Sequence, residues 1–129
     1  MSSTPRIRVL YVDDDPESCE MLGMLLDLSR IETKAIASGK QALHLMQAER
    51  FDLYLLDVWL PDLDGFELCQ RMRAIDPQTP IVFFSGAAYL EDHYRGLAAG
   101  ATAYVSKPDV DILLQTIEQL TSQTQLCAA

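Results

Sequence analysis

The chain has 129 residues, of which 49% are hydrophobic and 22% are charged, and these values are typical of one globular domain with a single core. Nineteen acidic and ten basic residues give a net charge of −9, which argues against direct binding to nucleic acid or to an anionic membrane, because both require basic protein surface. The three cysteines form no Cys-x-x-Cys pair, and no apolar run approaches the roughly 18 residues of a membrane span. We therefore expect a cytoplasmic protein with reduced thiols.

Short apolar runs alternate along the chain with stretches of helical spacing. The runs are rich in β-branched and aromatic residues and are too short for helices, as buried parallel strands are. In chain order, we expect strands over residues 7–12, 33–36, 53–56, 81–84 and 104–105.

The helices are predicted from their capping residues. Asp15 and Pro16 suit the N-cap and the first position of a helix. Ser38 and Asp64 each precede a Gln or Glu by three residues, which is the spacing of a capping box. Gly100 suits the left-handed position after a helix. In chain order, we expect helices over residues 16–29, after Ser38, from Asp64 to about 75, over 89–99 and after Asp109.

This alternation of five strands and five helices, with short connections, predicts one α/β domain. We expect a five-stranded parallel sheet that is doubly wound, in a flavodoxin-like three-layer sandwich. The domain is expected over residues 7–121, with a leader over 1–6 and a polar tail over 122–129 that frays.

Polar residues stand where the predicted strands end. Asp13 and Asp14 follow the first strand, Asp57 closes the third, Ser85 the fourth and Lys107 the fifth. The carboxyl ends of parallel strands share one edge of a sheet, and ligands bind there at the point where the strand order reverses. We therefore expect these residues to meet in one crevice.

Metal-assisted phosphoryl transfer is the chemistry that this set predicts. Three adjacent carboxylates raise one another's pKa unless a cation compensates them, and Mg²⁺, with Mn²⁺ as an alternative, prefers such oxygen ligands. A free carboxylate could attack phosphorus and form an acyl phosphate. Ser85 and Lys107 could then hold two phosphoryl oxygens, and Gly86 leaves room for the phosphoryl group.

At this point the sequence resembles a known family, the receiver domain of two-component response regulators, and it is similar to the single-domain chemotaxis type. The resemblance covers about residues 7–120 and rests on several motifs that occur in the family's order. These are Val12-Asp13-Asp14-Asp15-Pro16, Leu56-Asp57, Leu60-Pro61-Asp62-Leu63-Asp64-Gly65, Phe84-Ser85-Gly86-Ala87, Gly100-Ala101 before Tyr104, and Ser106-Lys107-Pro108.

The resemblance implies a metal site and a phosphoacceptor. Asp57 would take a phosphoryl group from a histidine kinase or a histidine phosphotransfer domain. Asp14 would bind Mg²⁺ directly, Asp13 through water, and Trp59 through its backbone carbonyl. The large Trp59 indole and the small Ala87 would control how water reaches the acyl phosphate, and we expect Trp59 to slow dephosphorylation.

The resemblance also implies a switch. Ser85 would turn toward the phosphoryl group, Lys107 would pair with it, and Tyr104 would swing inward. The face made by the fourth helix, fifth strand and fifth helix would then bind a downstream protein, a linked output domain of a longer parent, or a second copy of the chain. A cis peptide bond is expected between Lys107 and Pro108.

Two other functions remain open at this stage. An aspartyl-phosphate hydrolase of the haloacid dehalogenase type also uses an attacking aspartate with Mg²⁺, but its Asp-x-Asp-x-Thr motif does not match the residues from Asp13 onward. A receiver-like module that binds partners without phosphorylation would not need all five polar positions, and all five are occupied.

Overall fold

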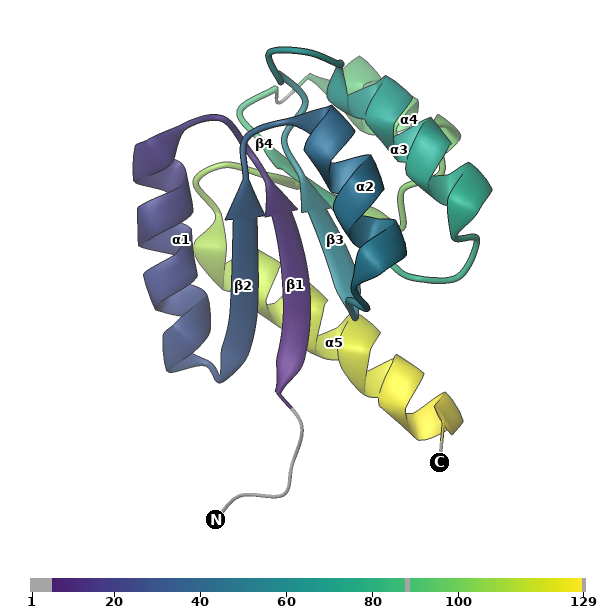
Figure 1. Cartoon of the computed structure of the whole chain (residues 1–129). Coiled ribbons are helices and arrows are strands. Elements are labelled where there is room, and N and C mark those ends of the chain that lie inside the picture. The colour runs from purple at the N-terminus through teal and green to yellow at the C-terminus, as the bar shows by residue number, and fades with distance from the viewer. Residues whose placement is uncertain (1–5, 88, 129) are drawn as a thin grey trace.

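The computed structural model describes residues 6–87 and 89–128, with side chains up to residue 122. Its strands and helices alternate along the chain (Figure 1). The strands are β1 (Ile7–Val12), β2 (Ile31–Ile36), β3 (Leu53–Leu56), β4 (Ile81–Ser85) and β5 (Ala103–Ser106). The helices are α1 (Pro16–Leu28), α2 (Gly39–Ala48), α3 (Gly65–Ile75), α4 (Leu90–Ala98) and α5 (Val110–Ala128).

All four strand pairs are parallel, and the order in the sheet is β2-β1-β3-β4-β5. The chain moves from β1 outward to β2 and then crosses back to place β3 on the other side of β1. The strand order therefore reverses between β1 and β3, and the loops that leave the carboxyl ends of these two strands lie where ligands bind in open α/β sheets. This confirms the predicted doubly wound sheet.

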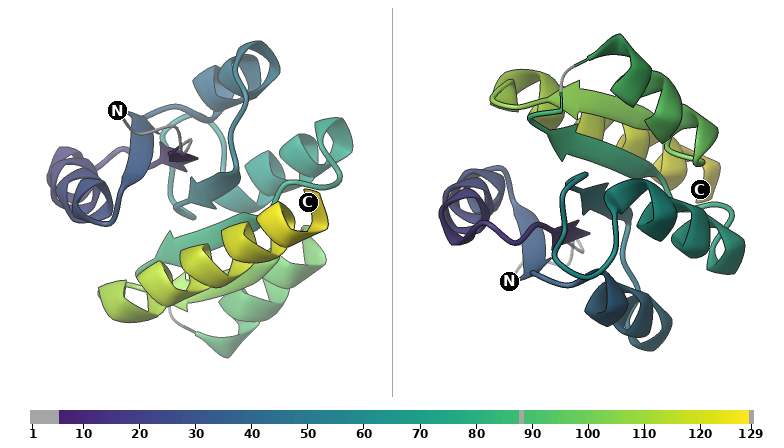
Figure 2. Two further views of the ribbon diagram at one scale, coloured as in Figure 1. Left: turned by 90° about the horizontal axis from the view of Figure 1, so that it is seen from below. Right: turned by 90° about the horizontal axis from the view of Figure 1, so that it is seen from above.

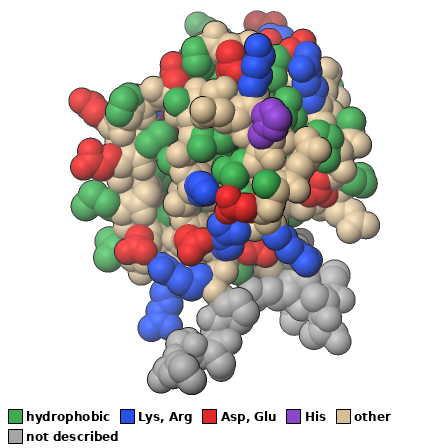
Figure 3. Space-filling view, in the orientation of Figure 1, with side chains coloured by type: hydrophobic (Ala, Val, Ile, Leu, Met, Phe, Trp, Pro, Cys, Tyr) green, Lys and Arg blue, Asp and Glu red, His purple; other side chains and the backbone are tan. Residues whose placement is uncertain are grey.

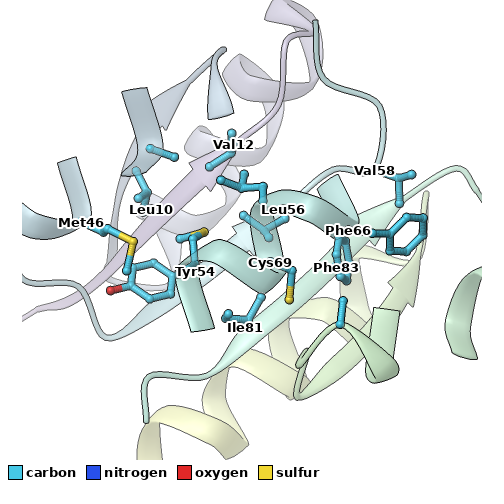
Figure 4. Close-up of a cluster of buried hydrophobic side chains, with 14 of the residues drawn as sticks. Leu10, Val12, Met46, Tyr54, Leu56, Val58, Phe66, Cys69, Ile81 and Phe83 are labelled. Atoms are coloured by element: carbon cyan, nitrogen blue, oxygen red, sulfur yellow. The ribbon is translucent and has the colours of Figure 1, made fainter. Parts of the chain in front are cut away.

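Helices cover both faces of the sheet, as the two end-on views show (Figure 2). One face packs against α1 and α5 through buried residues that include Leu22, Leu26, Leu113 and Ile117. The other face packs against α2, α3 and α4. In this second cluster the rings of Phe66 and Phe83 lie side by side (Figure 4), with their centroids 5.3 Å apart. The two clusters hold the sheet rigid beneath the loops at its carboxyl edge.

The N-caps predicted at Asp15, Ser38 and Asp64 are confirmed. Asp15 accepts a hydrogen bond from the backbone of the first turn of α1, and Ser38 and Asp64 do the same for α2 and α3. Gly100 follows α4 with a φ of +113°, a conformation that a residue with a side chain rarely adopts. Each N-cap fixes the residue at which its helix begins, so the loop between the preceding strand and the helix is short.

Two boundaries differ by more than one residue from those predicted. β2 begins at Ile31, two residues earlier than expected, because Ile31 and Glu32 continue the parallel register with β1. The expectation of a frayed tail over 122–129 is wrong for the described backbone, since α5 continues to Ala128. No Gly or Pro occurs from Val110 to Ala128 to end the helix. Most of the expected leader, residues 1–5, lies outside the described residues.

Charged side chains of both signs are interspersed on the surface, as one face shows (Figure 3). Near the amino ends of the strands, Arg8 pairs with Glu32 at 2.6 Å and with Glu49 at 2.8 Å. Within the part of the chain that the structure describes, no helix is long and apolar enough to cross a membrane.

Candidate functional site

The loops after β1 and β3 bring three carboxylates together. One carboxylate oxygen from each of Asp13, Asp14 and Asp57 lies within 4.8 Å of the others. Asp13 and Asp57 are buried, with 1% and 7% of their surface exposed, whereas Asp14 faces solvent. Carboxylates this close repel one another, and a cation between them would relieve this repulsion. The oxygen ligands and the exposed Asp14 suit a divalent cation that keeps several waters.

Lys107, at the end of β5, is the cation of this cluster. Its Nζ lies 2.7 Å from Asp13 Oδ2 and 3.7 Å from Asp57 Oδ2. The peptide bond between Lys107 and Pro108 is cis, as expected. The ammonium group thus links Asp13, which follows β1, to Asp57, which follows β3. Lys107 and Asp13 are almost a hundred residues apart in the sequence.

The two buried carboxylates differ in their pKa. Burial raises the pKa of Asp57, and the charge of Asp13 raises it further, although the Ser85 hydroxyl and Lys107 oppose this. Burial acts on Asp13 in the same direction, but hydrogen bonds from Lys107, Tyr11 and the Asp15 backbone lower the pKa of Asp13 overall. Asp13 is therefore held as an anion, while Asp57 is the carboxylate whose charge is least compensated and gains most from a cation.

Ser85 lies beside Asp57, and Tyr104 contacts the residues that follow Ser85. The Ser85 side chain is fully buried, and its Oγ accepts a hydrogen bond from the Ala87 N–H at 3.2 Å. The Tyr104 hydroxyl donates to the Ala87 carbonyl, and its ring stacks on Phe83 and His93 with centroid distances of 5.5 and 4.1 Å. Tyr104 is thereby tied to the loop that follows Ser85. The expected inward swing of Tyr104 stays a prediction.

Trp59 and Gly86, which the sequence places at the site, are both exposed to solvent. Trp59 is 64% exposed, so its indole is not packed into the core. Gly86 is also exposed, and a Cβ placed there would have no neighbour within 4 Å, which is consistent with the room expected beside Ser85. The contribution of the Trp59 carbonyl to a metal site stays a prediction.

Asp62 fixes the loop that carries Trp59. Its carboxylate accepts hydrogen bonds from the Ser38 hydroxyl at 2.9 Å and from the Gly39 and Lys40 N–H groups at 3.0 Å. These contacts fasten the loop after β3 to the N-terminus of α2, where the helix dipole favours a negative charge. Asp62 therefore limits how far the loop can move.

One residue of the site escapes prediction from the sequence. Tyr11 reads as a core residue of β1, but its hydroxyl donates a hydrogen bond to Asp13 Oδ2 at 2.5 Å. Residues two apart in a strand point to the same face, so a tyrosine two positions before a candidate metal-binding aspartate was the available signal.

Comparison with known proteins decides the family. A family model described as the response regulator receiver domain matches residues 9–118. The chain belongs to this family. It is therefore a receiver domain of the two-component type, a class of phosphoacceptor signalling domains, as the sequence motifs indicate.

Relatives of this receiver domain include longer proteins. The DNA-binding response regulator MtrA of Mycolicibacterium smegmatis is 42% identical over 105 residues, which cover 81% of this chain and 46% of MtrA. The gliding motility regulatory protein of Myxococcus xanthus is 38% identical over 120 residues, which cover 90% of this chain and 15% of that protein. The chain thus spans half or less of these curated relatives. MtrA is named a DNA-binding regulator, so our expectation of no nucleic acid binding is limited to the receiver domain itself.

Solved receiver domains have the same fold. The receiver domain of the Francisella response regulator 1452 superposes with a TM-score of 0.87 at 28% identity, covering 92% of this chain and 99% of that one. A CheY-like receiver domain protein from Methanospirillum hungatei gives a TM-score of 0.84 at 32% identity, covering 94% and 98%. These matches confirm the flavodoxin-like α/β fold.

Proposed function

We propose that Asp57 is the phosphoacceptor of this receiver domain. A carboxylate oxygen of Asp57 attacks the phosphorus of a phosphohistidine, the phosphorus–nitrogen bond breaks, and the histidine nitrogen keeps the electron pair and takes up a proton. The product is an acyl phosphate on Asp57. Asp57 suits this role because Asp13 is already paired with Lys107 and Tyr11, whereas Asp57 keeps the looser contact with Lys107, at 3.7 Å.

We further propose that Asp13, Asp14, Asp57 and the Trp59 carbonyl hold Mg²⁺. The closeness of the three carboxylate oxygens, within 4.8 Å, fits a cation that prefers oxygen ligands and keeps several waters. When bound, Mg²⁺ would offset the negative charge of the carboxylates and of the incoming phosphoryl oxygens. Asp14 is the exposed member and is accessible to an ion that arrives from solvent.

Lys107 and Ser85 would stabilise the transferred group. The Lys107 side chain is 22% exposed and its ammonium already lies between Asp13 and Asp57, so a small movement brings it to a phosphoryl oxygen on Asp57. The Ser85 hydroxyl can donate to a second phosphoryl oxygen. Both contacts strengthen as charge spreads over the equatorial oxygens of an in-line transition state. The domain would catalyse only its own phosphorylation and dephosphorylation.

The partner surface is proposed on α4, β5 and α5. The Tyr104 ring on β5 stacks on His93 of α4, so a change at Ser85 can reach this face through packed side chains. Exposed apolar residues are available there for a protein partner, a linked output domain or a second copy: Tyr89, Leu90, Tyr94, Leu97 and Ile112. Phosphoryl donors would be a histidine kinase or a histidine phosphotransfer domain in the cytoplasm.

The observation that carries this function is the cluster of three carboxylates with Lys107 at the carboxyl edge of the sheet. We expect acetyl phosphate with Mg²⁺ to phosphorylate the protein, and EDTA to reduce the rate at least about tenfold, since the uncompensated carboxylates repel the donor. Separation of phosphorylated from free protein on a phosphate-affinity gel measures this rate.

Two outcomes would contradict the proposal. Labelling that is absent with and without Mg²⁺ favours a module that binds partners independently of phosphorylation. Steady turnover of a phosphate ester by the pure protein favours a hydrolase of the haloacid dehalogenase type.

A further inference from the structure

The hydroxyl of the buried Tyr11 side chain contacts the functional site. The Tyr11 ring is fully buried in the cluster between the sheet, α1 and α5. A phenylalanine would fill the same apolar space without the need of a partner for its polar atom. The Tyr11 hydroxyl donates to Asp13 Oδ2, so its contact is with a candidate metal-binding carboxylate and not with the backbone.

Three donors hold the two carboxylate oxygens of Asp13. Oδ1 accepts from the Asp15 N–H at 3.0 Å, while Oδ2 accepts from the Tyr11 hydroxyl at 2.5 Å and from Lys107 Nζ at 2.7 Å. The Asp15 N–H belongs to the backbone at the start of α1. Tyr11 is fixed by its packing, and Lys107 is the donor on a long, partly exposed side chain.

These donors differ in what happens when a phosphoryl group arrives. Lys107 is proposed to turn toward the phosphoryl oxygens on Asp57, and it then gives up part of its contact with Asp13. The Tyr11 hydroxyl has no such alternative, because its ring is enclosed by the core. It is the donor that remains on Oδ2 throughout the cycle.

We propose that Tyr11 is a positioning residue of the magnesium site. Its hydroxyl sets the orientation of the Asp13 carboxylate toward the hydration shell of the ion and keeps that orientation when Lys107 moves. This inference rests on the proposed function, since it assumes that Asp13 takes part in binding Mg²⁺. Groups that hydrogen-bond to metal ligands commonly contribute to metal affinity by fixing ligand orientation.

The chain contains a matched control. Tyr54 on β3 is also buried, and its hydroxyl donates to a carboxylate, Asp76 Oδ2, at 2.9 Å. Burial alone would raise the pKa of Asp76, but the Thr79 hydroxyl, backbone N–H groups and Tyr54 lower this pKa to about 2. Asp76 follows α3, near the amino ends of the strands and away from the carboxylate cluster. Tyr54→Phe therefore removes the same kind of hydrogen bond without touching the site.

The test compares Mg²⁺ affinity in the full chain for wild type, Tyr11→Phe and Tyr54→Phe. Fluorescence of Trp59, the single tryptophan, follows the titration, and calorimetry checks it. We expect Tyr11→Phe to raise the Kd for Mg²⁺ about three- to tenfold. This is less than the increase in Kd of about tenfold or more that is typical when a residue bound directly to the metal loses its hydrogen-bond partner. Tyr54→Phe should change the Kd less than about twofold.

A double-mutant cycle separates positioning from a general loss of stability. Once Asp13→Ala has removed the acceptor of the Tyr11 hydroxyl, Tyr11→Phe should have no further effect on the Kd. Equal Kd values for Tyr11→Phe and Tyr54→Phe, the same Tyr11 effect in the Asp13→Ala background, or a Tyr11→Phe protein that does not fold would each overturn the inference. A wild type that binds no Mg²⁺ would instead contradict the proposed function itself.

Discussion

Replacement of Gly65 by alanine is expected to lower the free energy of unfolding by about 3 kcal/mol or more. A Cβ on Gly65 would lie 2.3 Å from the Asp57 carbonyl oxygen and 2.8 Å from the Val58 Cα. Both are backbone atoms, so no side-chain rotation can relieve the overlap. The Gly65 N–H also donates to the Val58 carbonyl at 2.7 Å, which draws the start of α3 against the strand end that carries Asp57. The loop must therefore open, and Asp57 must move with it.

Urea unfolding at neutral pH measures this loss, with Gly23→Ala as the matched control. Gly23 lies inside α1, and a Cβ there would have no neighbour within 4 Å. Alanine in a helix interior is better than glycine by about 0.5–1 kcal/mol, so Gly23→Ala should stabilise the protein. A Gly65→Ala protein with wild-type stability would show that the loop after β3 is not held as tightly as the structure indicates.

Lys107→Met is expected to destabilise the metal-free protein by about 2 kcal/mol at neutral pH and to tighten Mg²⁺ binding about tenfold. Lys107 lies 2.7 Å from the fully buried side chain of Asp13, and its loss leaves that carboxylate without a cation. The same loss removes a positive charge that competes with Mg²⁺ for Asp13 and Asp57. Saturating Mg²⁺ should therefore restore most of the lost stability.

Unfolding curves with and without Mg²⁺ check both parts of this expectation. Lys34→Met is the control, since Lys34 pairs with Glu49 at 2.9 Å on the surface, with side chains 47% and 32% exposed. Exposed pairs contribute less than about 1 kcal/mol, and Mg²⁺ should not compensate for this one. Weaker Mg²⁺ binding by Lys107→Met than by wild type would mean that Lys107 is not a competing charge at the site.

The fold could be predicted from the sequence almost completely, because its signals are local. Apolar runs mark the strands, and Asp15, Ser38 and Asp64 mark the starts of three helices. The end of α5 could not be predicted, because the polar residues after position 121 are compatible both with an exposed helix and with a frayed tail. Only the continued backbone hydrogen bonding shows a helix to Ala128.

The site could be predicted only as far as strand ends determine it. Asp13, Asp57 and Lys107 converge because parallel strands place their carboxyl ends at one edge, which topology alone requires. The hydroxyl of Tyr11 on Asp13, and the stacking of His93 on Tyr104, depend on side-chain rotamers and on how α4 packs. Such contacts are set by tertiary packing, and the sequence indicates at most that Tyr11 and Asp13, two residues apart, point to the same face.

The central claim is that Asp57 carries the phosphoryl group, and the mass of the intact protein tests it most directly. Wild type and Asp57→Asn are incubated with acetyl phosphate and Mg²⁺, with Asp64→Asn as a control that changes a helix cap outside the carboxylate cluster. We predict one phosphoryl adduct on wild type and on Asp64→Asn, and none on Asp57→Asn. An adduct of the same yield on Asp57→Asn would contradict the assignment of Asp57 as the phosphoacceptor.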